Sequence, residues 1–334
     1  MPLNEKKAKT IQYYPTKVPP KDIKPSDDAF HGSKKRRSAE WWYFDATFAN
    51  KYSLHVGVRT FSKKNKGKVS LFLEFYKEGK LLEKATKKFP FSEFKTGSEL
   101  PFVEIAGDTI VKFDEQRFKE KGEWAYDIKL ELENHKVNLK FIGTTQGFKF
   151  ETKAESWAVA LPKASIIGDI TISGKKMKVE GIGYHDHNWN YSLLTPFTYG
   201  KGWFWGKIMS ETLTVSWAQV IKSGNKGEIL AVFNQDNNGY ISANTKNIFF
   251  EKDKFIKNHR KKMPTSFTIK IDDEVNGKEL EADVKMEAKE THFDKVMVIA
   301  PYWRYHVKAE GYISIGSKKE KVNEIQIMEY LRFS

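Results

Sequence analysis

Residues 126–132 read YDIKLEL, and apolar side chains alternate with charged ones along the whole run. The same period of two appears in residues 213–217, which read LTVSW, and again near the C-terminus over residues 325–333. Alternation over such lengths predicts antiparallel strands with one buried and one solvated face.

Short turn signals that contain glycine separate these runs at the spacing expected for strand ends. They are Lys66-Gly67, Glu78-Gly79, Ser173-Gly174, Ser223-Gly224-Asn225, Asn276-Gly277 and Gly316-Ser317. Many short strands punctuated in this way predict an all-β chain built as sandwiches or barrels. Helical periodicity is weak, and the one helix we expect is a short one over residues 251–262.

The chain has 334 residues, enough for two domains of ordinary size. Residues 1–38 are rich in proline and lack sustained periodicity, so we expect a basic, extended and weakly structured arm there. We place the boundary between the two following domains at Thr195-Pro196. The predicted organisation is therefore an arm over 1–38, a first domain over 39–195 and a second over 196–334.

Composition excludes several kinds of site. The chain contains no cysteine, which rules out disulfides, thiolate nucleophiles and zinc sites with cysteine ligands, and is compatible with a reducing cytoplasm. The first residues lack the apolar core of a secretory signal, and no apolar stretch is long enough to span a membrane. We therefore expect a soluble, cytoplasmic protein.

The formal net charge is +14, and part of it is concentrated in the arm, where residues 34–37 read KKRR. Such a balance attracts anionic surfaces, so we expect a peripheral contact of the arm with anionic membrane. A nucleic-acid partner is a weaker hypothesis, because the other basic residues are spread out and no recognised nucleic-acid signature is present. We therefore expect no nucleic-acid partner.

Aromatic residues make up 14% of the chain, and one dense block of them opens the first predicted domain. Residues 40–45 read EWWYFD, so a strand would place Trp41 and Tyr43 on one face and Trp42 on the other. One face must be core, and we expect the other to meet a cavity or the second domain. Asp45 ends the block as a candidate acid.

A second unusual segment lies in the middle of the chain, where residues 181–190 read GIGYHDHNWN. On a strand, His185 and His187 would point to one side and Asp186 to the other. If the segment turns, all three side chains could converge. Tying strands together through hydrogen bonds is the alternative interpretation of this cluster.

Further aromatic and polar residues occur in the second half, in residues 201–206 (KGWFWG) and 302–306 (YWRYH). Glu329 shares a strand face with apolar residues and needs a partner, for which Arg304 is the natural candidate.

These segments resemble the lipocalin-like superfamily that includes AttH-type proteins, carotenoid 1,2-hydratase, kievitone hydratase, tocopherol cyclase and double-barrel Diels–Alderases. The resemblance covers residues 40–334 and rests on the blocks at 40–44 and 183–189. It implies two lipocalin-like antiparallel β-barrel or sandwich halves, with a site for an isoprenoid- or lipid-like ligand near their junction. It also implies that His187 and Trp189 occupy positions linked to activity in the hydratases. The hydratases carry a Tyr and an Asp on a later strand, whereas residues 213–217 contain neither.

Hydration, cyclisation or isomerisation of an alkene requires a proton donor in a dry pocket and aromatic faces that stabilise a cation. We expect Asp186 to be the donor with His187 as its partner, or the reverse, with His185 beside them and Asp45 in reserve. The expected substrate-binding residues are Trp41, Trp42, Tyr43, Asp45, Tyr184, Trp189, Trp203, Trp205, Trp217 and Trp303.

Two alternatives to catalysis by these residues remain. The first is a carrier or sensor that binds an apolar ligand without changing it. The second is a metal site at His185 and His187 with His55, His306 or Glu155 as third ligand, which we consider weaker. We expect no metal and no cofactor.

Overall fold

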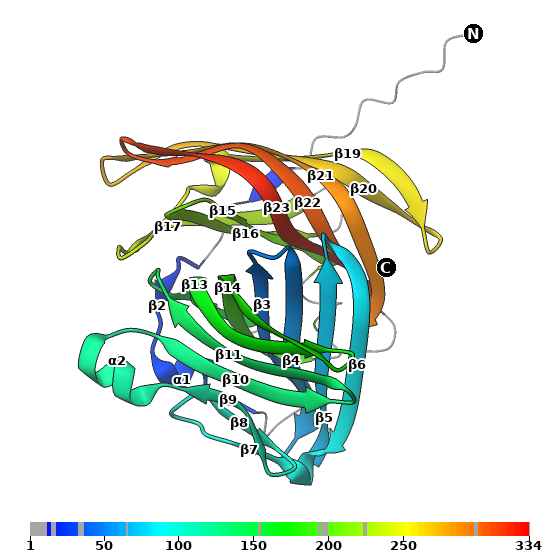
Figure 1. Ribbon diagram of the computed structural model, residues 1–334. Coiled ribbons are helices and arrows are strands. Elements are labelled where there is room, and N and C mark those ends of the chain that lie inside the picture. Colours follow the sequence, from blue (N-terminus) through cyan, green and yellow to red (C-terminus); the bar gives the residue numbers. More distant parts are fainter. Residues whose placement is uncertain are drawn as a thin grey trace.

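The computed structural model describes residues 12–14, 18–32, 37–64, 66–152, 155–192, 195, 200–222, 226–296 and 300–333. Two large sheets contain all the strands among them, which confirms the all-β prediction. Figure 1 shows the second sheet curving over one end of the first. None of the helices in these ranges is long and apolar enough to cross a membrane.

The first sheet has 13 strands and curls into a nearly closed barrel (Figure 1). Its main order is β6-β5-β4-β3-β14-β13-β11-β10-β9-β8-β7, with β12 paired to β13 and β2 paired to β12. The bounds are β2 Lys21–Asp22, β3 Ser38–Phe48, β4 Tyr52–Lys63, β5 Lys66–Lys77, β6 Lys80–Pro90, β7 Phe94–Thr96, β8 Phe102–Ile105, β9 Asp108–Phe113, β10 Ala125–Leu132, β11 His135–Gly143, β12 Phe148–Glu151, β13 Ser156–Ile172 and β14 Lys175–Ser192.

The second sheet has ten strands in the order β1-β17-β16-β15-β23-β22-β21-β20-β19, with β18 paired to β17. All its pairings are antiparallel except that of β1 with β17. The bounds are β1 Gln12–Tyr14, β15 Gly202–Met209, β16 Leu213–Ile221, β17 Lys226–Gln235, β18 Tyr240–Ser242, β19 Ile248–Asn258, β20 Lys261–Val275, β21 Lys278–Val296, β22 Ala300–Ile315 and β23 Lys318–Arg332.

Each sheet encloses its own apolar core, and a third apolar cluster lies between them. The first sheet contributes Tyr43, Phe148, Phe150, Val159 and Tyr184 to this third cluster, and the second contributes Trp205, Met209, Val232 and Ile327. Residues of the two halves are therefore buried against one another, and the wall that they share is rich in aromatic rings.

The alternation at residues 126–132 is confirmed in β10, where every second side chain is buried and its neighbours are more exposed. The helix expected over 251–262 is wrong. That segment forms the end of β19 and the start of β20, because Ile248 and Phe250 turn into the second core while the backbone pairs along the hairpin.

The structure adds short helices that the sequence pattern did not indicate: α1 Pro25–Asp28, α2 Glu115–Lys121, and the 3-10 turns η1 Phe91–Glu93 and η2 Thr245–Asn247. Helix α2 begins after Asp114, whose side chain accepts the backbone N–H of Arg117, and ends at Gly122 with φ of 70°.

Part of the expected arm belongs to the first barrel. Asp28, at the end of α1, is fully buried, and the indole Nε1 of Trp42 donates a hydrogen bond of 2.8 Å to its backbone oxygen. Asp28 and Ala29 are buried and Phe30 packs against the first core, in contrast to the weakly structured arm that we expected, while Pro19, Lys21, Asp22, Lys24 and His31 are exposed. Lys34, Lys35, Arg36 and Pro196 lie outside the described residues, and the domain boundary at 195/196 stays a prediction.

Candidate active site between the two sheets

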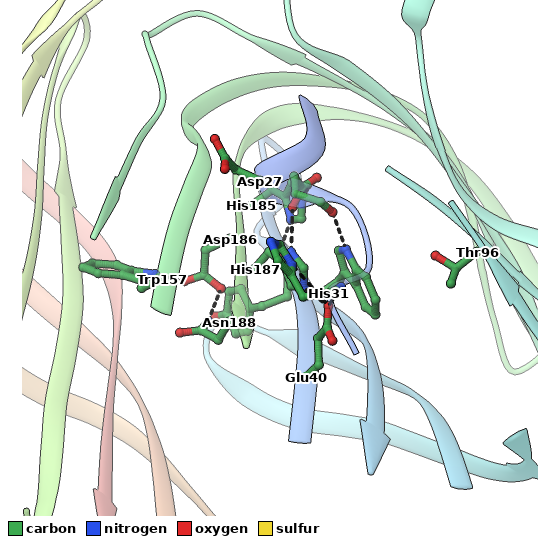
Figure 2. A network of polar contacts seen from close by, with 12 residues as sticks. Asp27, His31, Glu40, Thr96, Trp157, His185, Asp186, His187 and Asn188 are labelled. Carbon is green, nitrogen blue, oxygen red and sulfur yellow. Dashed lines mark hydrogen bonds and ion pairs between the residues drawn. The ribbon is translucent and has the colours of Figure 1, made fainter. Parts of the chain in front are cut away.

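Strand β14 carries the mid-chain segment, paired with β3 on one side and β13 on the other. The register shifts between Asn188 and Tyr191 against β3, where Asn190 has φ of 67°, and within β13 opposite residues 183–186. Its side chains alternate, so Asp186 faces the second sheet while His185 and His187 face the interior of the first barrel (Figure 2). The expected pairing of Asp186 with His187 is therefore not formed.

A cavity of about 120 Å³ lies between the sheets on the Asp186 side. Strands of both halves line it, and its wall is mostly apolar, with six aromatic residues and three carboxylates. The lining residues are Trp41, Tyr43, Phe150, Thr152, Glu155, Trp157, Asp186, Asn188, Trp203, Trp205, Ala218, Val220, Leu230 and Glu329. The apolar wall with few polar groups is typical of a small-molecule site.

Asp186 is the most constrained acid in this wall, with 5% of its surface exposed. Its Oδ2 accepts hydrogen bonds of 2.8 Å from the hydroxyl of Tyr184 and from the indole Nε1 of Trp157. Its Oδ1 accepts one of 3.1 Å from Nδ2 of Asn188. Figure 2 shows Trp157 and Asn188 on either side of the carboxyl group.

Burial raises the pKa of Asp186 to about 7, because the charged form loses its hydration, while the hydrogen bonds from Trp157 and Tyr184 offset part of this rise. A carboxyl group with a pKa near neutrality both gives up and takes back a proton readily at physiological pH. The arrangement is thus chemically suited to general acid and base catalysis.

A chain of buried polar contacts crosses the junction behind the cavity. Tyr43 donates a hydrogen bond of 2.8 Å to Oδ2 of Asp45 and accepts one of 2.5 Å from Nη1 of Arg304. The same Nη1 donates 2.9 Å to Glu329, which confirms the pair expected from the sequence. Lys207 forms a buried ion pair with Asp45.

Tyr43 stays protonated within this network of contacts. Burial raises the pKa of Tyr43 well above its usual value and outweighs the opposing effect of the Arg304 charge, so the phenol keeps its proton. Asp45 is committed to Lys207 and Tyr43 and is not among the lining residues. It is therefore less suited than Asp186 to deliver a proton into the cavity.

His185 and His187 belong to a separate buried network inside the first barrel. Nδ1 of His185 lies 2.9 Å from the backbone oxygen of Tyr43, and Nε2 lies 3.0 Å from Oδ2 of Asp28. Nε2 of His187 lies 3.0 Å from Oε1 of Glu40. Neither imidazole lines the cavity between the sheets.

The structure divides the remaining expected binding residues into three groups. Trp41, Tyr43, Trp203 and Trp205 line the cavity, and Tyr184 supports Asp186 from behind. Trp42 and Trp189 stack on the opposite side of β14, against His187 and His31 respectively. Trp217 and Trp303 are buried in the core of the second half.

Sequence reasoning missed several lining residues, notably Phe150, Trp157 and Asn188. Asn188 has the parity of Asp186 along β14, so strict alternation could have placed it on the same face. Phe150 and Trp157 come from β12 and β13, and only the pairing of those strands brings them to the cavity.

Solved structures share this architecture. An AttH protein of Nitrosomonas europaea has a TM-score of 0.65 at 13% identity, over 93% of this chain and 96% of that one. CghA with Sch210972 has a TM-score of 0.61 at 8% identity, over 89% of this chain and 88% of that one. Kievitone hydratase of Nectria haematococca has a TM-score of 0.57 at 13% identity, over 97% of this chain and 99% of that one. The fold resemblance read from residues 40–44 and 183–189 is therefore confirmed.

One curated relative matches in sequence, the quinolone epoxide rearrangement protein penF of Penicillium thymicola. It is 33% identical over 69 residues, which span 21% of this chain and 18% of that protein. No family model matches the chain.

Proposed function

We propose that this protein is an enzyme that binds an apolar small molecule in the cavity between its two sheets and transforms it by acid-catalysed hydration, cyclisation or isomerisation. The observation that carries the proposal is the buried Asp186, with a pKa of about 7, in an aromatic cavity wall. The similar proteins include a hydratase and an epoxide rearrangement protein, which supports chemistry of this class.

The reaction begins when protonated Asp186 gives its proton to one carbon of an alkene, or to the oxygen of an epoxide. The electron pair of the π bond forms the new C–H bond, or the C–O electron pair stays on oxygen, and a cationic carbon remains. Neighbouring indole faces, such as those of Trp203 and Trp205, each stabilise a cation by about 0.5 to 2 kcal/mol.

The cation is then quenched by water, by an internal nucleophile or by loss of a neighbouring proton. In each case the Asp186 carboxylate accepts the released proton and returns to its starting state. The cavity of about 120 Å³ is smaller than the roughly 300–1,000 Å³ of typical ligand pockets, so we expect it to enclose the reacting end of a longer molecule. An isoprenoid- or lipid-like chain fits that description.

Asp186→Asn tests this assignment, because the amide keeps the shape of the side chain but carries no transferable acid proton. With a panel of prenylated phenols and terpene epoxides followed by mass spectrometry, we expect turnover to fall by roughly 10²- to 10⁴-fold. Asp272→Asn, at an exposed position on β20, is the matched control. Binding of 8-anilinonaphthalene-1-sulfonate should survive both changes.

A carrier or sensor that uses the same cavity is the alternative. It predicts probe binding with no turnover by the wild-type chain on any substrate of the panel. Equal turnover by the Asp186→Asn variant and the wild type would instead reject Asp186 as the acid while leaving the enzyme proposal standing.

We also propose peripheral contact with anionic membrane, where an apolar substrate would reside. The basic segment at residues 34–37 supports it. So does the hairpin of β19 and β20, where Phe255 and Ile256 are 45% and 47% exposed among the basic residues of 254–262.

Co-sedimentation with vesicles of phosphatidylserine and phosphatidylcholine tests the contact. We expect binding to weaken in Phe255→Ser/Ile256→Ser and after removal of the charges at 34–37, and to fall as salt rises. Deleting all of residues 1–38 would be a poor test, because it also removes the buried Asp28. Equal sedimentation of wild type and both variants would contradict the proposal.

A further inference from the structure

Three side chains that can bind a metal gather on the barrel side of β14, away from the cavity. His31, Glu40 and His187 each offer one ligand atom, and these atoms all lie within 4.8 Å of one another. Oε1 of Glu40 lies 3.0 Å from Nε2 of His187 and 3.6 Å from Nδ1 of His31. Figure 2 shows the three side chains converging.

We propose that His31, Glu40 and His187 form a binding site for a divalent transition-metal ion, with zinc as the first candidate. Two imidazole nitrogens and one carboxylate oxygen are a donor set that zinc accepts, and ligand atoms 3.0 and 3.6 Å apart can share one ion. No cysteine is needed, and the remaining coordination position is open to water.

An independent observation behind His187 supports the site. Nδ1 of His187 and Oδ1 of Asp28 lie 3.6 Å apart, both residues are fully buried, and neither atom has a hydrogen-bond partner. Two unsatisfied polar atoms so deep in a barrel are costly.

A metal ion on Nε2 of His187 would remove this cost. It would fix the ring proton on Nδ1. A small movement of the side chains would then let this N–H donate a hydrogen bond to Oδ1 of Asp28. A metal-bound imidazole usually donates its second N–H to a carboxylate or carbonyl oxygen in this way. The other Asp28 oxygen is already held by Tyr126 and His185, at 2.6 and 3.0 Å.

The three ligands are held in place before any ion arrives. The His31 ring stacks on Trp189 at 4.0 Å and the His187 ring on Trp42 at 4.4 Å. The Glu40 carboxylate accepts backbone N–H groups of His31 and Gly32, at 2.8 and 2.9 Å. The His31 side chain is 27% exposed, which gives an ion a way in from solvent.

This ligand set differs from the one considered from the sequence. His185 is occupied by Asp28 and Tyr43, and His55 pairs with Glu74 at 3.1 Å, so neither contributes. The site also lies across β14 from Asp186, and its role is separate from the proposed chemistry. An ion bound there would fasten residues 18–32 to the barrel through His31.

The test uses the untagged full chain, because a histidine tag would itself bind metal. The protein is stripped with chelator, dialysed against zinc chloride and analysed for zinc per chain and for thermal unfolding. We expect about one zinc ion per chain from this single site and a higher Tm with zinc. His31→Phe keeps a flat ring on Trp189 but has no ring nitrogen, and should weaken zinc binding by more than roughly tenfold.

His259→Phe is the matched control, since His259 is an exposed histidine that stacks on Phe293. It should bind zinc like the wild type. His31→Ala gives the same test if the phenylalanine variant does not fold. A wild-type chain that retains no zinc, or a folded His31 variant that retains as much as the wild type, would overturn the proposal.

Discussion

Arg304 in the second sheet donates a hydrogen bond of 2.5 Å to the hydroxyl of Tyr43 in the first, and both side chains lie at the buried junction. Through Tyr43 the guanidinium is linked to Asp45, and directly it is linked to Glu329. The Tyr43 ring and Glu329 also form part of the cavity wall. The contact that joins the two halves therefore also positions the candidate site.

Arg304→Met should destabilise the protein strongly, because the part-buried Glu329 carboxylate and the Tyr43 hydroxyl both lose the charged donor, which leaves Glu329 with the Tyr302 hydroxyl alone. Loss of one partner of a buried pair costs about 3–5 kcal/mol, which urea unfolding would measure. Arg260→Met, at an exposed turn, is the control and should change the free energy of unfolding by less than about 0.5 kcal/mol. A similar loss in both variants would contradict the role assigned to Arg304.

Ala218→Leu should block the cavity without touching Asp186. Ala218 lines the cavity, and a leucine there would project its added carbon atoms into the space between the sheets. We expect binding of 8-anilinonaphthalene-1-sulfonate to fall, while the free energy of unfolding changes by less than about 3 kcal/mol. Ala49→Leu, at an exposed position after β3, should bind the probe normally. Undiminished binding to the Ala218 variant would place the ligand site elsewhere.

Removing residues 1–32 should destabilise the barrel far more than removing residues 1–17. The longer deletion takes away Asp28 and leaves the hydroxyl of Tyr126, the indole N–H of Trp42 and Nε2 of His185 unpartnered in the core. Each unsatisfied buried group costs about 1–3 kcal/mol. Thermal unfolding of both truncations checks this, and equal Tm values would show that the segment is dispensable.

The stability of the fold should depend on pH through Asp186. Its pKa is raised from 3.8 to about 7 in the folded protein, so the native state binds the proton more tightly than the unfolded state. This stabilising effect is fully present below about pH 4 and is lost as the pH rises through about 7.

Asp186→Asn cannot titrate, so its unfolding free energy should rise relative to that of the wild type as the pH increases from about 4 to 7. Urea unfolding across the range measures the difference, with Asp272→Asn as the control. Parallel pH curves for wild type and the Asp186 variant would contradict the raised pKa.

The sequence predicted this fold well where the pattern was local. The alternation in residues 126–132 places Tyr126 and Ile128 inside and Asp127 outside, as the structure does. For residues 181–190 the sequence left two geometries open, and the pairing of β14 with β3 and β13 through Asn188 selects the alternating one.

Other features depend on contacts that no local pattern carries. Trp157 reaches Asp186 because β13 pairs with β14, and Leu230 reaches the same cavity from the other sheet. Asp28 lies in a proline-rich stretch without periodicity, and only the barrel interior explains its burial. Such long-range placements were beyond sequence reasoning.

The proposed chemistry depends most on the protonation of Asp186, which ¹³C NMR of the labelled aspartate carboxyl groups can follow directly, with Asp186→Asn to assign the signal. We predict that the Asp186 resonance titrates with a midpoint at a pH of about 7. A midpoint near the ordinary aspartate value of about 4 would show a carboxylate already ionised at neutral pH, and would contradict its role as the acid.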